Sequence, residues 1–285
     1  MATILDYSRK FEKFLKLRNN ASSTIDVYTG LLRSMLSYFK KDPISITPDM
    51  IGDWILTFKS PKTKRQAWYT IANFYGNVMG LRDYMIKIPK AKENKYIPET
   101  LNVQEVMRLI GSISNLKQRA CLQLIYACGL RISEATNMRI ADIDGVRLQV
   151  HIKMSKGAKD RVIPIPQDTL NVLREYYQAY KPKEFLFNGD SNHSQYSERS
   201  IQQVFHLAKH AAGIYKHVTV HSLRHSRATH LLCNGMDSAL IMRFLGHSNI
   251  KTTNNFYLHT KVDDLGLAML RADVLILNHS KQLAA

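Results

Sequence analysis

The side chains that could do chemistry gather in four short segments in the second half of the chain. Together they supply two arginines, a lysine, two or three histidines and a tyrosine. Two guanidinium groups can hold the non-bridging oxygens of a phosphate bidentately, and both stay charged at physiological pH. The segments are Gly129–Glu134, the turn around Lys156, His221–His225, and Leu245–Ser248 with Tyr257 after it.

The tyrosine and the basic groups indicate transfer of a phosphoryl group to a protein hydroxyl. A tyrosine with its ordinary pKa of about 10 needs a base or a strong positive field before it attacks phosphorus. A lysine or histidine can protonate the leaving 5′ oxygen, and fixed positive charge stabilises the pentacoordinate transition state. His221 and Arg224 have the spacing that places two side chains on one face of a helix, and His225 also fits that face.

Two other chemistries have weaker sequence support. A zinc site at His221, His225 and His247 would lack the glutamate of an H-E-x-x-H motif, and no partnering carboxylate lies near these histidines in the sequence. The chain also has no glycine-rich loop that ends in Gly-Lys-Ser or Gly-Lys-Thr, so ATP use is not indicated.

The net charge of +17 is the strongest signal in the composition. Positions 1–99 hold 17 basic and 9 acidic residues, so they carry +8 and the rest of the chain carries +9. A basic surface spread over a whole folded chain suits a long polyanion, and duplex DNA is the usual one. The alternative is a basic protein without a nucleic acid partner.

The length and the cysteines narrow the class of protein further. A chain of 285 residues predicts about two domains. No apolar run approaches the ~18 residues of a spanning helix, and the charged start of the chain is not a secretion signal. The three cysteines form no C-x-x-C pair, so we expect reduced, buried thiols in a cytoplasmic protein. They are Cys121, Cys128 and Cys233. With duplex DNA as the expected partner, the expected location is the nucleoid.

Helical signals dominate the first 90 residues. Ser23–Asp26 has the pattern of a capping box, and Thr47-Pro48-Asp49 gives an N-cap, a proline at N1 and an acidic first turn. A third helix is predicted over 64–85. A basic cluster at its start either contacts DNA phosphates or is a solvated helix entry. The cluster consists of Lys59, Lys62, Lys64 and Arg65.

The second part of the chain begins after a lysine- and proline-rich stretch, residues 86–99, which predicts a linker. We assign a helical domain to 1–88, the linker to 89–100 and a second domain to 101–285. Asn102 with Glu105 predicts a capped helix, and the alternation over 148–165 predicts a β-hairpin. The predicted fold class is mainly α, an all-helical domain followed by a mainly-α domain with a small antiparallel sheet.

Three of the reactive segments resemble, in order, the sequence boxes of the tyrosine recombinases, the family of phage integrases and Xer-type resolvases. Cys128–Glu134 is similar to the first arginine box, His221–His230 to the H-x-L-R-H box, and Leu245–Tyr257 to the nucleophile segment. The resemblance covers roughly residues 100–275. The first domain is similar to the family's core-binding, DNA-binding module only in size, helicity and position.

The resemblance implies a site-specific recombinase that cuts and rejoins DNA strands. Arg131 and Arg224 would clamp the scissile phosphate, and Lys156 would protonate the leaving 5′ oxygen. Tyr257 would be the nucleophile and would form a 3′-phosphotyrosyl intermediate. No metal or nucleotide cofactor is implied, because the phosphotyrosine conserves the energy of the cleaved bond.

The resemblance also implies supporting residues. His221 and His247 would hydrogen-bond the phosphate and assist proton transfer, and Glu134 would support the first arginine. Lys153 and Lys159 are rivals for the general acid, which the family pattern places directly before the hairpin glycine.

The spacing of the nucleophile departs from the family pattern. Tyr257 is ten residues after His247, whereas the family usually has nine, the position of Phe256. We favour one extra loop residue that is absorbed before Tyr257. The alternative is a displaced nucleophile in a weakened protein, because a shift of about 1 Å already costs rate heavily.

Residues 262–277 are apolar and helix-prone. The resemblance implies a helix that docks on a neighbouring protomer and links four copies on duplex DNA with paired inverted half-sites; the alternative is packing on its own domain. Two other functions stay open, a recombinase-like DNA-binding protein without strand exchange and a relaxing topoisomerase of the same chemistry.

Overall fold

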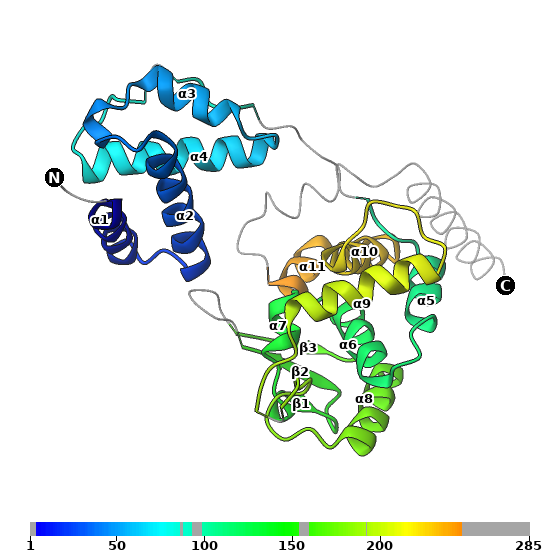
Figure 1. The fold of residues 1–285 in the computed structure, drawn as a ribbon. Helices are drawn as coiled ribbons and strands as arrows, with labels where there is room; N and C mark the ends of the chain where they lie inside the picture. Colours follow the sequence, from blue (N-terminus) through cyan, green and yellow to red (C-terminus); the bar gives the residue numbers. More distant parts are fainter. Residues whose placement is uncertain (1–3, 86–87, 93–98, 154–159, 192, 247–285) are drawn as a thin grey trace. The chain divides into compact units, whose positions relative to one another are not determined.

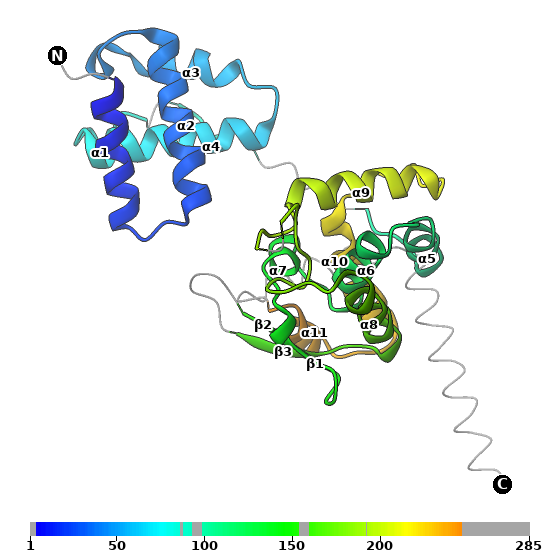
Figure 2. The same ribbon diagram turned by 60° about the horizontal axis from the view of Figure 1, so that its bottom comes forward.

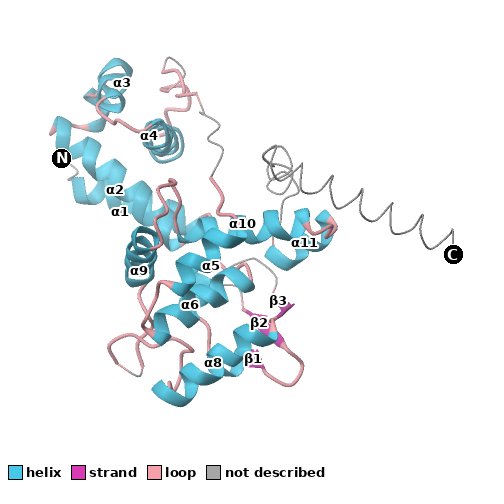
Figure 3. Ribbon diagram, turned by 90° about the vertical axis from the view of Figure 1, so that its right-hand side faces the viewer, coloured by secondary structure: helices cyan, strands magenta, loops and turns pink. Residues whose placement is uncertain are grey.

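The computed structural model describes residues 4–85, 88–92, 99–153, 160–191 and 193–246 (Figure 1). The chain divides into two compact units, residues 1–96 and 97–285. Both are built mainly from helices, and the second unit adds a small antiparallel sheet (Figure 3). This architecture confirms the predicted fold class. Within the described residues, no helix has both the length and the apolar character needed to cross a membrane.

The first unit packs its helices around a core that includes the fully buried Phe11 and Phe74, whose rings meet edge to face at 5.8 Å. Its last α-helix runs directly into a short π-helical turn. The elements are α1 (Ile4–Leu17), α2 (Ser22–Phe39), η1 (Pro43–Ser45), α3 (Pro48–Leu56), α4 (Pro61–Asn73) and η2 (Phe74–Val78).

The N-termini of the helices in this unit can be compared with the predicted capping signals. Thr47 caps α3 as predicted, because its hydroxyl accepts from the Met50 amide at 3.4 Å. The prediction of a capping box at Ser23–Asp26 is wrong. The N-cap residue of α2 is Ala21, two residues before Ser23, and it offers no side-chain cap. The left-handed Asn19 turns the chain just before it.

The third predicted helix starts too late and ends too late. Helix α4 begins at Pro61, because a proline at N1 has its φ already set for a helix. Lys62, Lys64 and Arg65 therefore lie inside its first turns. The helical run ends at Val78, and Gly80 follows in the left-handed region with φ of 75°.

The second unit is organised around α6, which buries residues on nearly every side and contacts α5, α7, α8, α9 and α10. Asn102 caps α5 in the predicted box with Glu105. The helices are α5 (Val103–Gly111), α6 (Leu116–Ala127), α7 (Ile132–Thr136), α8 (Gln167–Tyr180), α9 (Glu198–Ala211), α10 (Val220–Cys233) and α11 (Ser238–Leu245), with a 3-10 turn, η3, at Ile140–Asp142.

The sheet has the order β1-β2-β3 and is antiparallel throughout. The strands are β1 (Ile143–Asp144), β2 (Gln149–Ile152) and β3 (Arg161–Pro164). Val150 lies opposite Ile163, which confirms the predicted hairpin, whereas β1 was not predicted. Strand β3 contacts α11, so the sheet adjoins the helix that ends at Leu245, where the Leu245–Tyr257 segment begins (Figure 2).

Candidate active site

The first arginine box forms the turn between α6 and α7. Arg131 is the N-cap residue of α7, and its amide donates to Glu134 Oε2 at 2.8 Å. The Arg131 Nη1 atom donates to the other carboxylate oxygen, Oε1, at 2.7 Å. Because one carboxylate binds both ends of Arg131, the side chain is oriented by its own helix. Its exposed fraction is 33%, so solvent still reaches the guanidinium.

The second arginine is much more deeply buried than the first. Arg224 is near the start of α10 and is only 1% exposed. Its Nη1 donates to the Gly129 carbonyl and its Nη2 to the Leu245 carbonyl, both at 2.6 Å. Its Nη1 also lies 3.8 Å from Glu134 Oε2. The fold therefore brings two boxes about 90 residues apart in the sequence to one carboxylate.

A third arginine, which none of the sequence motifs contains, binds the same carboxylate. Arg161 on β3 donates from Nη1 to Glu134 Oε1 at 3.0 Å and from Nη2 to Oε2 at 2.8 Å. Its Nε donates to the Phe244 carbonyl at 3.0 Å. The side chain is 8% exposed. The strand alternation could have indicated this position, because Arg161 is two residues before the buried Ile163 and so lies on the same face of β3.

The charges of this cluster shift the ionisation of its members. Burial by itself raises the pKa of Glu134, but hydrogen bonds and charge from Arg161, with the Arg131 amide and the Arg224 charge, hold that pKa below its usual value. Burial lowers the pKa of Arg224 to about 9, and the charge of Arg131 acts in the same direction. Near neutral pH the carboxylate is therefore ionised and the arginine charged.

His221 is at the accessible edge of the cluster, at the start of α10. Desolvation lowers the pKa of His221, and the charges of Arg224 and Arg131 lower it further against the opposing effect of Glu134. The imidazole is therefore neutral near pH 7 and can accept a proton. The His225 ring meets it edge to face at 4.5 Å, one helical turn away.

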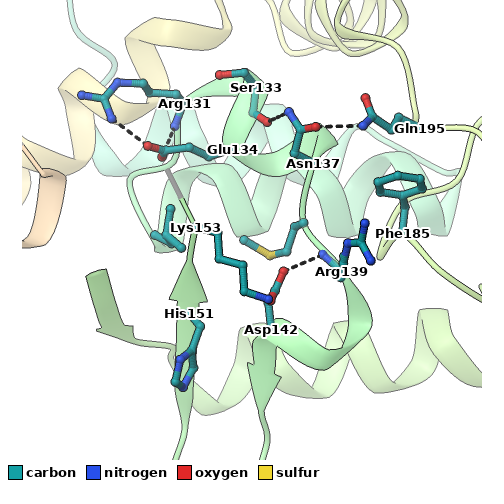
Figure 4. Close-up of a pocket in the computed structure, with 12 residues that line it drawn as sticks. Arg131, Ser133, Glu134, Asn137, Arg139, Asp142, His151, Lys153, Phe185 and Gln195 are labelled. Carbon is teal, nitrogen blue, oxygen red and sulfur yellow. Dashed lines mark hydrogen bonds and ion pairs between the residues drawn. The ribbon is translucent and has the colours of Figure 1, made fainter. Parts of the chain in front are cut away.

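A cleft of about 550 Å³ opens beside Arg131 and extends toward the sheet (Figure 4). Basic side chains line it, including Arg139, His151 and Lys153. Lys153, a rival for the general acid, is bound by Asp142 at 2.6 Å. Glu134 and Asp142 also line the cleft, so a small excess of positive charge from Arg131, Arg139 and Lys153 faces it beside the arginine cluster. Such an excess suits an extended polyanion.

The structure brings together Arg131, Glu134, His221 and Arg224 from the predicted site. Three predicted site residues lie outside the described residues: the general acid Lys156, the histidine His247 and the nucleophile Tyr257. The zinc alternative depends on His247. Also outside the described residues are Lys159, Phe256 and residues 262–277.

The basic cluster of the first unit lies at the start of α4. Lys59 and Lys62 are exposed, and Lys64 and Arg65 are half-buried. Further along the same helix, Trp68 lies 4.3 Å from the Lys90 ammonium in a cation–π contact. This end of α4 therefore presents cations beside an aromatic surface.

Comparison with known proteins places the chain in a family. The phage integrase family matches residues 99–263. A tyrosine recombinase of Thermosipho africanus is 31% identical over 85% of this chain and 90% of its own length. The tyrosine recombinase XerA of Pyrococcus horikoshii is 30% identical over 90% of this chain and 89% of its own length.

Solved structures agree with the sequence comparison. The crystal structure of XerA recombinase matches with a TM-score of 0.58 and 26% identity, over 95% of this chain and 99% of that one. A lambda integrase dimer bound to a COC′ core site matches in fold, with a TM-score of 0.74 and 17% identity over 90% and 77% of the two chains. The chain therefore belongs to the phage integrase family of tyrosine recombinases, which confirms the resemblance of its sequence boxes.

Proposed function

We propose that this recombinase cuts and rejoins DNA at a specific site through a covalent 3′-phosphotyrosyl bond to Tyr257. The observation that carries the proposal is the convergence of Arg131 and Arg224 on Glu134, with His221 at the open edge. Such a cluster presents fixed positive charge without reorganisation, which is what a phosphoryl transition state needs.

Each group then has one task. The Tyr257 hydroxyl oxygen attacks the scissile phosphorus, and the bond between phosphorus and the 5′ oxygen breaks. The phenolic proton passes to His221, which is neutral because its pKa is lowered. His247 hydrogen-bonds the phosphate beside it. Lys156 donates a proton to the leaving 5′ oxygen. In the second step a 5′ hydroxyl of the partner strand attacks the phosphotyrosine and releases Tyr257.

The substrate we propose is duplex DNA with paired inverted half-sites. The net charge of +17 supports a DNA partner, and so does the basic cluster at the start of α4, Lys59, Lys62, Lys64 and Arg65. Among fold neighbours, XerH is solved bound to palindromic difH substrate. Lambda integrase is solved as a tetramer bound to a Holliday junction. We therefore propose a homo-tetramer on DNA, linked through residues 262–277.

The biological setting belongs to the same proposal. We place the enzyme on the nucleoid in the cytoplasm, in integration, excision or resolution by a mobile element or chromosome system. The buried thiols of Cys121 and Cys128, each with a pKa raised to about 12 by burial, agree with inert core cysteines. Membership of an enzyme family favours this function over DNA binding without strand exchange.

The test first finds the site and then uses it. The protein is incubated with nicked duplexes from a randomised library, and the DNA that stays bound to protein after denaturation is sequenced. Two inverted copies of the recovered site then flank a plasmid segment, with scrambled copies as the control. Inversion between intact sites supports the proposal. Tight binding without adducts would favour the binding protein, and relaxation of both plasmids without inversion would favour a topoisomerase.

A further inference from the structure

One carboxylate in the active-site cluster serves three guanidinium groups. Glu134 accepts from Arg131 and from both terminal nitrogens of Arg161, and it lies 3.8 Å from Arg224. Its side chain is 5% exposed, so water screens these charges weakly. The four side chains together carry three positive charges and one negative charge.

Which of the guanidinium groups neutralises Glu134 decides how much positive charge faces the phosphate. Without Arg161, the ionised Glu134 would offset one charge of the two proposed clamp residues, Arg131 and Arg224. With Arg161, the cluster keeps a surplus of two positive charges. A phosphorane formed by phenolate attack on a phosphodiester gathers about two negative charges, so this surplus matches the charge that develops.

The contacts of Arg161 separate it from the clamp residues. Both terminal nitrogens face Glu134 in a fork–fork pair, the geometry in which guanidinium and carboxylate bind most strongly. The Nε atom binds the Phe244 carbonyl at the end of α11, directly before the residues that lead to the nucleophile. With 8% exposure, its side chain has little surface left for DNA.

We propose that Arg161 is a positioning residue for strand cleavage: it neutralises Glu134 and so leaves the charges of Arg131 and Arg224 to the scissile phosphate. The inference rests on the proposed roles of those two arginines. It predicts that the loss of Arg161 is harmful chiefly because Glu134 stays charged, and that a second change which removes the Glu134 charge repairs the defect.

The experiment compares wild type, Arg161→Gln, Glu134→Gln/Arg161→Gln and Arg174→Gln in the full chain. Arg174 is an exposed arginine on α8, so its variant controls for the loss of one positive charge. Adduct formation on a nicked duplex should slow by about 100-fold in Arg161→Gln, a loss typical of one electrostatic group. The double variant should recover at least about 10-fold, because the amide introduced by Glu134→Gln can still cap α7 without opposing the clamp.

A second readout needs neither DNA nor activity. The charges around His221 set its pKa, and NMR titration of its ring reports them. Arg161→Gln should raise the pKa of His221, because Glu134 is then less neutralised, and the double variant should return it toward the wild-type value. If the wild type forms no adduct, the proposed function fails while this titration still decides the charge claim.

Two results would overturn the inference. One is a double variant that cleaves as slowly as Arg161→Gln or more slowly, which would mean that Arg161 acts only by packing. The other is a His221 pKa that does not respond to Arg161→Gln. If Arg161→Gln does not fold, the double variant decides alone. A rate within about 10-fold of wild type supports the inference, and a loss of about 100-fold contradicts it.

Discussion

Arg224 Nη1 donates to the Gly129 carbonyl at 2.6 Å and so ties the start of α10 to the turn that carries Arg131. The turn can offer that carbonyl because Gly129 adopts the left-handed conformation with φ of 57°. The two arginine boxes of the family are therefore joined by backbone geometry as well as by the shared carboxylate of Glu134. This contact makes the position of one arginine depend on the backbone beside the other.

Gly129→Ala should destabilise the second unit. A Cβ atom there would lie 2.9 Å from the side chains of both Phe244 and Leu245, in a conformation that L-residues rarely adopt. We expect the free energy of unfolding to fall by about 1–3 kcal/mol, measured by urea denaturation. Gly111→Ala is the matched control, because nothing lies within 4 Å of its Cβ position. Equal stability of the two variants would contradict this account of the turn.

The two proposed clamp arginines should affect cleavage much more than DNA binding. Lysine keeps the charge, but one ammonium cannot reproduce the fork that binds both Gly129 and Leu245 carbonyls through Arg224. Arg131→Lys and Arg224→Lys should each slow adduct formation by about 100- to 1,000-fold. The dissociation constant for the same duplex should change by less than about 10-fold. A loss confined to binding would show that these arginines only hold DNA.

The acid stability of the second unit should depend on Glu134. Its folded-state pKa lies below the ordinary 4.5, so the carboxylate stabilises the fold above about that pH. The contribution is lost as the pH falls through the folded-state pKa. Glu134→Gln should therefore flatten the fall in unfolding free energy below pH 4.5, measured by urea titrations from pH 6 downward. The same acid slope in both proteins would contradict the assigned ionisation.

The basic cluster at the start of α4 should determine part of the salt dependence of DNA binding. Lys62→Gln/Lys64→Gln removes two of the proposed phosphate contacts, each worth about 0.9 in the slope of log affinity against log salt. We expect the slope to decrease in magnitude by about 2. Lys183→Gln, an exposed lysine in the second unit, should leave it nearly unchanged. An unchanged slope in the double variant would favour the alternative that these lysines are solvated side chains at a helix start and do not contact DNA.

The sequence predicted those parts of the fold that local signals control. Thr47-Pro48 and Asn102 with Glu105 predicted helix starts because caps are short-range interactions. The strand alternation predicted the hairpin of β2 and β3. The start of α2 was wrong because Ser23 and Asp26 also fit inside a helix, and the turn at Asn19 decides where the helix begins.

The site was less predictable because its contacts join distant segments. The three boxes predicted that Arg131 and Arg224 act together. Arg161 was missed, since a lone arginine on a short strand is usually solvated, and only its pairing with Glu134, 27 residues earlier, gives it a partner. The spacing of two residues between Arg161 and Ile163 could have indicated its burial, because alternate residues of a strand share a face and Ile163 faces the core.

Cleavage through Tyr257 is tested most directly by identifying the residue that becomes covalently bound to DNA. The protein is trapped on a nicked duplex of the recovered site, digested, and the peptide that carries the nucleotide is sequenced by mass spectrometry. We expect a phosphotyrosyl link at Tyr257, the loss of all adduct in Tyr257→Phe, and normal duplex binding by that variant. An adduct that persists in Tyr257→Phe, or that maps to another residue, would contradict cleavage through Tyr257.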